Sequence, residues 1–193
     1  MDSRFRGNDS EVNMEYKNIA ISGDIGTGKT TLAENLAEKL GWKHINAGDY
    51  FRKWHKENSI PLEESEKVPE DMDRAFDRDF ANQMKTSKNT VFESRLAGWL
   101  ARDLKKVYKI LVITDFDEAM KRVANRDAIS VEEAKEKATQ RSGSHKEKFK
   151  KLYGAIDYLN PKYFNLVVDT TNMSPQETLE YVLNAFPKTP ANN

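Results

Sequence analysis

The sequence of 193 residues contains no cysteine. Disulfides, cysteine-ligated zinc, iron–sulfur clusters and thiol nucleophiles are therefore excluded, and the composition suits the reducing cytoplasm, where we expect the protein to work. Net charge is lacking as well, because 31 Lys and Arg residues balance 31 Asp and Glu residues. A balanced chain has no global field that would draw it to nucleic acid or to anionic membranes, so we expect neither as a partner.

Long apolar runs are also missing. No stretch approaches the ~20 apolar residues that a membrane-spanning helix requires. Residues 1–13 carry charge without the apolar segment of a secretory signal, and they have too little apolar surface to offset the entropy of ordering. We therefore expect a disordered N-terminal extension at 1–13, one domain at 14–187 and a frayed tail at 188–193.

Short β-type runs alternate with helical patterns along the chain, which is typical of an α/β fold with a mostly parallel sheet. We expect strands at 18–22, 44–46, 90–92, 109–114 and 165–169. Leucines every fourth residue predict a helix that ends at Gly41, and a second helix over about 70–85 would carry one apolar stripe. The residues of that stripe are Met72, Phe76, Phe80 and Met84.

One segment matches the phosphate-binding pattern G-x-x-x-x-G-K-[ST] in full, after a predicted strand and before a predicted helix. Its glycines let backbone N–H groups turn inward around a phosphate, and the helix start directs its dipole at the same anion. Lys29 can reach the β- and γ-phosphates, and the hydroxyl of Thr30 can ligate Mg²⁺. We expect ATP to bind along Gly23, Asp24, Ile25, Gly26, Thr27, Gly28, Lys29, Thr30 and Thr31.

Several classes of P-loop protein do not fit. The Asn-Lys-x-Asp element by which GTPases read guanine is absent from the sequence, and the chain is too short for a motor-type ATPase. A compact kinase of small molecules remains, because phosphoryl transfer needs cations around the migrating group and the chain supplies arginines.

The sequence resembles the nucleoside monophosphate kinases, most closely the short cytidylate kinases of archaeal type, from about residue 17 to residue 186. The resemblance rests on ISGDIGTGKTTLAENLAEKLG, HINAGDYFRKW, VFESRLAGWL, KRVANRD and RSGSHKEKFKKLYG. It implies a three-layer P-loop fold with a parallel central sheet and helices on both faces. It also implies a monophosphate-binding insertion at about 49–88, a lid at about 138–158, and a monomer that transfers the γ-phosphate of ATP to CMP or dCMP with Mg²⁺.

The resemblance assigns roles to four residues on the acceptor side. Asp49 and Arg52 begin the acceptor-binding segment, with Arg52 on the monophosphate. Arg95 would hold the acceptor phosphate near the γ-phosphate, and Glu93 would orient Mg²⁺ through water. The alternatives are a solvated helix residue for Arg52, a surface arginine for Arg95 and a paired carboxylate for Glu93.

On the donor side, the resemblance places Arg122 near the base and Arg126 near the phosphates. Salt bridges to Asp117 or Glu118 are the simpler alternative. Residues 135–151 hold seven basic and two acidic side chains, which fits either a lid over a triphosphate or a solvated helix. Arg141 occupies the position of a lid arginine, whereas Lys148 stands where a second one is expected.

Three histidines are scattered without metal-ligand spacing, and we expect them to be structural or exposed: His44, His55 and His145. Two other functions stay open. One is a small P-loop kinase acting on AMP, UMP or a non-nucleotide metabolite. The other is a nucleotide-binding module without turnover, in which the basic lid would contact RNA in a salt-sensitive manner.

Overall fold

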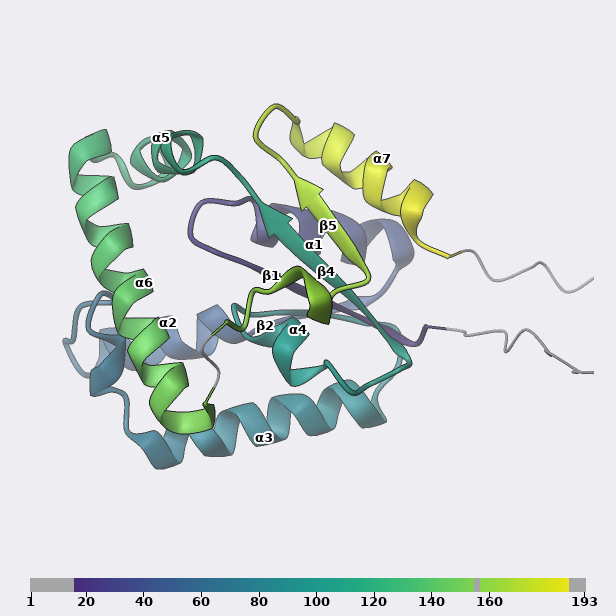
Figure 1. Ribbon diagram of the computed structural model, residues 1–193, viewed down its shortest axis with the longest axis horizontal. Coiled ribbons are helices and arrows are strands. Elements are labelled where there is room, and N and C mark those ends of the chain that lie inside the picture. The colour runs from purple at the N-terminus through teal and green to yellow at the C-terminus, as the bar shows by residue number, and fades with distance from the viewer. Residues whose placement is uncertain (1–15, 155–156, 188–193) are drawn as a thin grey trace, which may run out of the picture.

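The computed structural model describes residues 16–154 and 157–187, so the predictions for 1–13 and 188–193 lie outside the described residues. Five parallel strands form one sheet in the order β2-β3-β1-β4-β5 (Figure 1). The strands are β1 (Asn18–Gly23), β2 (Lys43–Asn46), β3 (Thr90–Glu93), β4 (Val107–Ile113) and β5 (Leu166–Asp169). The predicted strands and the parallel sheet are confirmed, with ends that differ by at most two residues.

Helices cover both faces of this sheet. In Figure 1, α1 and α7 lie on one side and α3 and α4 on the other, while α5 and α6 extend beyond the end of β4. The helices are α1 (Lys29–Leu40), α2 (Ala47–Glu57), α3 (Glu70–Thr86), α4 (Ala97–Leu100), α5 (Phe116–Asp127), α6 (Val131–Tyr153) and α7 (Pro175–Ala185), with 3₁₀ turns η1 (Ser65–Lys67) and η2 (Pro161–Tyr163). None of the described helices is long and apolar enough to cross a bilayer.

Strand β1 is buried from end to end because both of its faces pack against helices. Successive side chains of a strand point to opposite faces. Ile19 and Ile21 accordingly join the core under α1 and α7, whereas Ala20 joins the core under α3 and α4. This double coverage explains why the strand shows no polar alternation in the sequence.

The buried face of α3 differs from the predicted stripe. Phe80 and Met84 are buried as expected, but Met72 and Phe76 are only partly buried. The other buried positions of this helix are Asp73 and Asp77. Residues spaced four apart move progressively around a helix that has 3.6 residues per turn. The four residues of the predicted stripe therefore cannot all lie on the same face. Two carboxylates therefore point inward from α3.

The carboxyl ends of β1, β2 and β3 meet at one edge of the sheet. Glu93 at the end of β3 pairs with Ile21 of β1 and with Asn46 of β2. The chain leaves β1 toward β2 on one side of the sheet and leaves β3 toward β4 on the other. Such a reversal opens a crevice at the carboxyl ends of the strands in parallel α/β sheets. The predicted insertion (49–88) contains α3 and most of α2, and the predicted lid (138–158) contains the second half of α6; that division into functional parts stays a prediction.

Candidate active site

The segment after β1 forms a tight loop that leads directly into α1. Gly26 and Gly28 have φ values of 77° and 84°, which side-chain-bearing residues rarely adopt. A Cβ atom on Gly26 would also lie 2.5 Å from the carbonyl oxygen of Ala119 on α5. Since α1 begins at Lys29, its free N–H groups and positive dipole end face the space that the loop encloses.

Lys29 lies inside this loop. Its ammonium donates to the carbonyl oxygen of Asp24, 3.2 Å away. Part of the side chain lines the cavity, yet enough protein surrounds the ammonium that burial lowers its pKa to about 8, despite the opposing charge of Glu93. A polyphosphate at this position would restore the charged form of the lysine.

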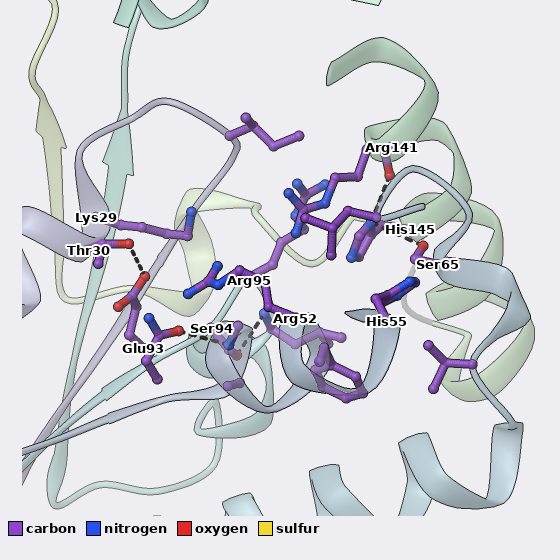
Figure 2. A pocket seen from close by; sticks show the side chains of 18 of the residues that line it. Lys29, Thr30, Arg52, His55, Ser65, Glu93, Ser94, Arg95, Arg141 and His145 are labelled. Carbon is purple, nitrogen blue, oxygen red and sulfur yellow. Dashed lines mark hydrogen bonds between the residues drawn. The ribbon is translucent and has the colours of Figure 1, made fainter. Parts of the chain in front are cut away.

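Thr30 and Glu93 place a hydroxyl and a carboxylate oxygen side by side below the loop, and both are oxygen ligands of the kind that Mg²⁺ prefers. The hydroxyl of Thr30 donates to Oε1 of Glu93 at 2.6 Å (Figure 2). Nε2 of His44 lies 3.0 Å from Oε2 of the same carboxylate. Glu93 is only 2% exposed. No cluster of three or more metal-ligating side chains occurs in the described residues. The pair therefore fits Mg²⁺, which keeps several waters and takes few protein ligands.

Arg95 reaches toward the loop from the end of β3. Its side chain is 9% exposed, and one guanidinium nitrogen lies 3.1 Å from Oδ1 of Asp24. Ser142 of α6 donates to the same oxygen at 3.0 Å. Burial would raise the pKa of Asp24, but Arg95, the N–H of Ile25 and the Ser142 hydroxyl together lower it. The Asp24 carboxylate thus joins the loop, Arg95 and α6 instead of pointing only to solvent.

Arg52 and Asp49 come from successive turns of α2. Arg52 lines the cavity and donates to Asp49 at 2.6 Å. The side chain of Asp49 is 72% exposed. It lines neither of the two cavities that open beside the phosphate-binding loop. The structure therefore brings Arg52 to the site and leaves Asp49 behind it, where the carboxylate holds the guanidinium.

A cavity of about 770 Å³ opens on the α1 side of the loop and receives both arginines of α5. Arg122 pairs with Glu118 at 3.3 Å and donates to the carbonyl oxygen of Thr170 at 2.7 Å. Arg126 pairs with the neighbouring Asp127 at 2.7 Å, which is neither of the partners predicted from the sequence. Both guanidiniums therefore line this cavity while they hold these partners.

Arg141 of α6 lines this cavity and also the neighbouring one. Its Nε is buried and has no hydrogen-bond partner among the described residues. Burial lowers its pKa to about 10, and the nearby charges of Arg95 and Arg52 act in the same direction. A buried cation beside other cations is costly unless an anion joins them, so this cluster is suited to bind phosphates.

The second cavity, of about 140 Å³, runs from Lys29 past the arginines to the space between α2, α3 and α6. Figure 2 shows Lys29, Thr30 and Glu93 at one end and His55, Ser65 and His145 at the other. The sequence analysis placed Lys148 in the expected lid but did not predict that it shares a polar lining with the other side chains of this far end. Its residues are His55, Ser65, Asp73, Asp77, His145 and Lys148. The sequence contained part of the information needed to find them, since Asp73 and Asp77 share a helix face with Phe80 and Met84.

The parallel sheet and the glycine-rich loop define a three-layer P-loop fold. A gluconokinase from Sinorhizobium meliloti has a similar fold, with a TM-score of 0.57 over 88% of this chain and 91% of that chain at 14% identity. The cytidylate kinase-like family model matches residues 18–172. The cytidylate kinases of Thermococcus kodakarensis and Pyrococcus abyssi are 40% and 39% identical, covering 81% and 82% of this chain and 81% and 87% of their own lengths. The chain belongs to the cytidylate kinase-like family.

Proposed function

We propose that the protein transfers the γ-phosphate of ATP to CMP or dCMP, giving the diphosphate and ADP. The observation that carries this proposal is the junction of two cavities at one cluster of cations. Lys29, Arg52 and Arg141 line both cavities, and the helix start of the P-loop borders both of them. The names of the relatives support cytidine monophosphate as the acceptor.

In this proposal, ATP lies in the larger cavity with its phosphates on the loop amides and Lys29. The acceptor enters the smaller cavity with its phosphate between Arg52 and Arg95. An acceptor phosphate oxygen attacks the γ-phosphorus as the bond to the β-phosphate oxygen breaks. That oxygen is already ionised, so the protein needs no general base.

The contribution of the protein is positioning and charge neutralisation. Arg95 supplies a planar fork that binds a phosphate bidentately, which lysine cannot do. Arg126 and Arg141 neutralise charge on the transferred group. Thr30, with Glu93 acting through water, would hold Mg²⁺, which supplies further neutralisation of the phosphates when bound.

A coupled assay of ADP release tests this function. The unaltered chain is given ATP and Mg²⁺ with CMP, dCMP, UMP, AMP, shikimate or gluconate in separate reactions. We expect the largest kcat/KM with CMP or dCMP, and we expect Lys29→Met to lower it at least about 100-fold. ADP release with shikimate or gluconate alone would contradict the acceptor, and ATP binding without acceptor-dependent release would indicate a binding module.

A further inference from the structure

Asp24 is a residue that the phosphate-binding pattern does not require. The pattern accepts any residue at this position, and a carboxylate close to a polyphosphate is repelled by it. The side chain of Asp24 is 43% exposed and lines neither of the two cavities, whereas Arg95 lines the smaller one. The carboxylate therefore meets Arg95 from outside the space that the phosphates would fill.

One oxygen of Asp24 gathers donors from three parts of the chain. Its Oδ1 accepts from the N–H of Ile25 at 2.7 Å and from the hydroxyl of Ser142 at 3.0 Å, and a guanidinium nitrogen of Arg95 lies 3.1 Å away. The main chain is fixed as well, because the carbonyl oxygen of Asp24 accepts from the ammonium of Lys29 at 3.2 Å. Both the backbone and the side chain of Asp24 are thus held in place.

Asp24, Arg95 and Ser142 form a closed triangle. A second guanidinium nitrogen of Arg95 donates to the hydroxyl oxygen of Ser142 at 3.4 Å, and that hydroxyl donates its own hydrogen to Asp24. A hydroxyl can donate once and can also accept, so the contacts of Ser142 use both functions. A guanidinium has five N–H donors, and the triangle occupies two of them. Donors therefore remain for a phosphate in the smaller cavity, which Arg95 lines.

Charge balance explains only part of this arrangement. Burial lowers the pKa of Lys29, and Arg95 and Arg141 add to this effect. Asp24 acts in the opposite direction, so its carboxylate relieves repulsion among the cations of the free protein. Bound phosphates would relieve the same repulsion without Asp24, but they cannot order Arg95 before they arrive. An arginine side chain loses rotamer freedom when it is fixed, and this cost opposes substrate binding unless the side chain is ordered beforehand.

We propose that Asp24 is a positioning residue of the phosphoryl transfer, an inference that rests on the proposed function. Its carboxylate holds the guanidinium of Arg95 in the orientation that receives the acceptor phosphate, and Ser142 joins α6 to the same point. The side chain of Asp24 touches neither nucleotide and acts through Arg95. The site is therefore ordered before the acceptor enters, and a group that is already in place lowers the barrier more than one that must first be ordered.

The test compares Asp24→Asn with the matched variant Asp103→Asn. Asp103 forms an ion pair with Arg102 at 3.5 Å, its side chain is 86% exposed, and it lines neither cavity. We expect Asp24→Asn to lower kcat/KM for CMP about tenfold, because a neutral amide holds a guanidinium less firmly than a carboxylate does. Affinity for a nonhydrolysable ATP analogue should change less than about threefold, because the loop binds phosphates through its backbone. Asp103→Asn should change neither quantity.

Three results of this comparison would overturn the proposal. An unchanged kcat/KM would show that Arg95 needs no support from Asp24. An equal loss of affinity for the ATP analogue would show that the substitution disturbs the loop as a whole. A gain in kcat/KM would show that Asp24 competes with the phosphates for Arg95.

A double-mutant cycle tests whether Asp24 acts through Arg95. Arg95→Met removes the charged group that the carboxylate holds, so adding Asp24→Asn to it should lower kcat/KM by less than about threefold further. The same tenfold loss in both backgrounds would show that Asp24 acts on some other group, and the proposal would fail.

Ser142→Ala leaves the loop sequence intact and so does not depend on how an altered loop folds. It removes one neutral corner of the triangle, and we expect kcat/KM for CMP to fall about two- to fivefold with affinity for the ATP analogue unchanged. Loss of analogue affinity in place of kcat/KM would contradict the proposal. If the unaltered chain phosphorylates CMP and the variants match it, only this inference fails. If the unaltered chain phosphorylates no nucleoside monophosphate, the proposed function fails and this inference fails with it.

Discussion

Lys29 is a cation whose charge depends on its ligand. Burial lowers its pKa to about 8 in the free protein, with Arg95 and Arg141 acting in the same direction. A bound triphosphate favours the charged ammonium and raises that pKa. Nucleotide binding is therefore coupled to the protonation of one side chain.

We predict that affinity for a nonhydrolysable ATP analogue falls as pH rises above about 8. Below that value Lys29 is already charged, so binding takes up no proton. Above it, the free protein has lost the proton and binding must restore it, which lowers the affinity by up to about tenfold per pH unit. Calorimetric titration between about pH 7.5 and 9.5 measures the slope.

The control for this prediction is Lys29→Arg, because a guanidinium stays charged throughout this range. Its affinity at any one pH can differ from that of the unaltered chain, but its slope against pH should be flat. The same slope in both proteins would show that another group is responsible.

At the scale of elements, polar contacts join α6 to α3 and to the segment around η1. Lys148 pairs with Asp73 of α3, with side chains 8% and 4% exposed. The hydroxyl of Ser144 bonds to Glu66, and Arg74 donates to the carbonyl oxygen of Leu152 at 2.9 Å. Charged and polar groups thus contribute to the position of α6 over the site.

We predict that Lys148→Met lowers the free energy of unfolding by about 3–5 kcal/mol at pH 8, because it leaves Asp73 buried without its partner. Burial already raises the pKa of Asp73 above 3.8, and loss of the ammonium raises it further. A raised folded-state pKa means that the loss is small below the unfolded-state pKa, grows as pH rises from that value to the folded-state pKa, and is constant above it. Urea unfolding at pH 5 and pH 8 measures it.

Two variants accompany this measurement. Lys146→Met changes an exposed lysine of the same helix and should alter stability by no more than about 0.5 kcal/mol. Lys148→Met with Asp73→Asn removes both charges and should recover part of the loss. A loss that is independent of pH would rule out the buried charge as its cause.

The same elements show how far sequence periodicity reaches. The capping box at Ser174 and Glu177 and the Gly41 end of α1 were predictable, because these signals act within one turn of helix. The buried face of α3 was not predicted, because Asp73 and Asp77 are polar, and sharing a helix face with Phe80 and Met84 does not by itself show that they are buried. Periodicity counts apolar residues and misses buried charges.

At the scale of the whole molecule, the two cavities form a single path. Arg52 and Arg141, which line both, come from α2 and α6. In the proposed reaction, donor and acceptor would therefore approach one another across residues that belong to different parts of the chain. A ligand that joins both nucleotides should occupy the full path.

We predict that adenosine and cytidine linked through five phosphates stabilise the protein more than a mixture of an ATP analogue and CMP. At about 0.1 mM, the linked halves meet at an effective concentration near 1 mM, a gain of about 1.4 kcal/mol. For a chain of this size that raises the melting temperature by about 3–6 °C beyond the mixture. Thermal unfolding measures it, with Lys29→Met as the variant expected to lose most of the shift. An equal or larger shift with the mixture would show that the cavities do not act as one path.

The sequence by itself determined the phosphate-binding loop, the alternation of strands and helices, and the family resemblance, because each depends on residues close together in the chain. Only the tertiary structure decided which polar residues share the smaller cavity. Asp77, Lys148 and Arg52 are far apart in sequence, and their meeting depends on how α2, α3 and α6 pack. Burial and mutual charge, which set the chemistry of these side chains, exist only once that packing is complete.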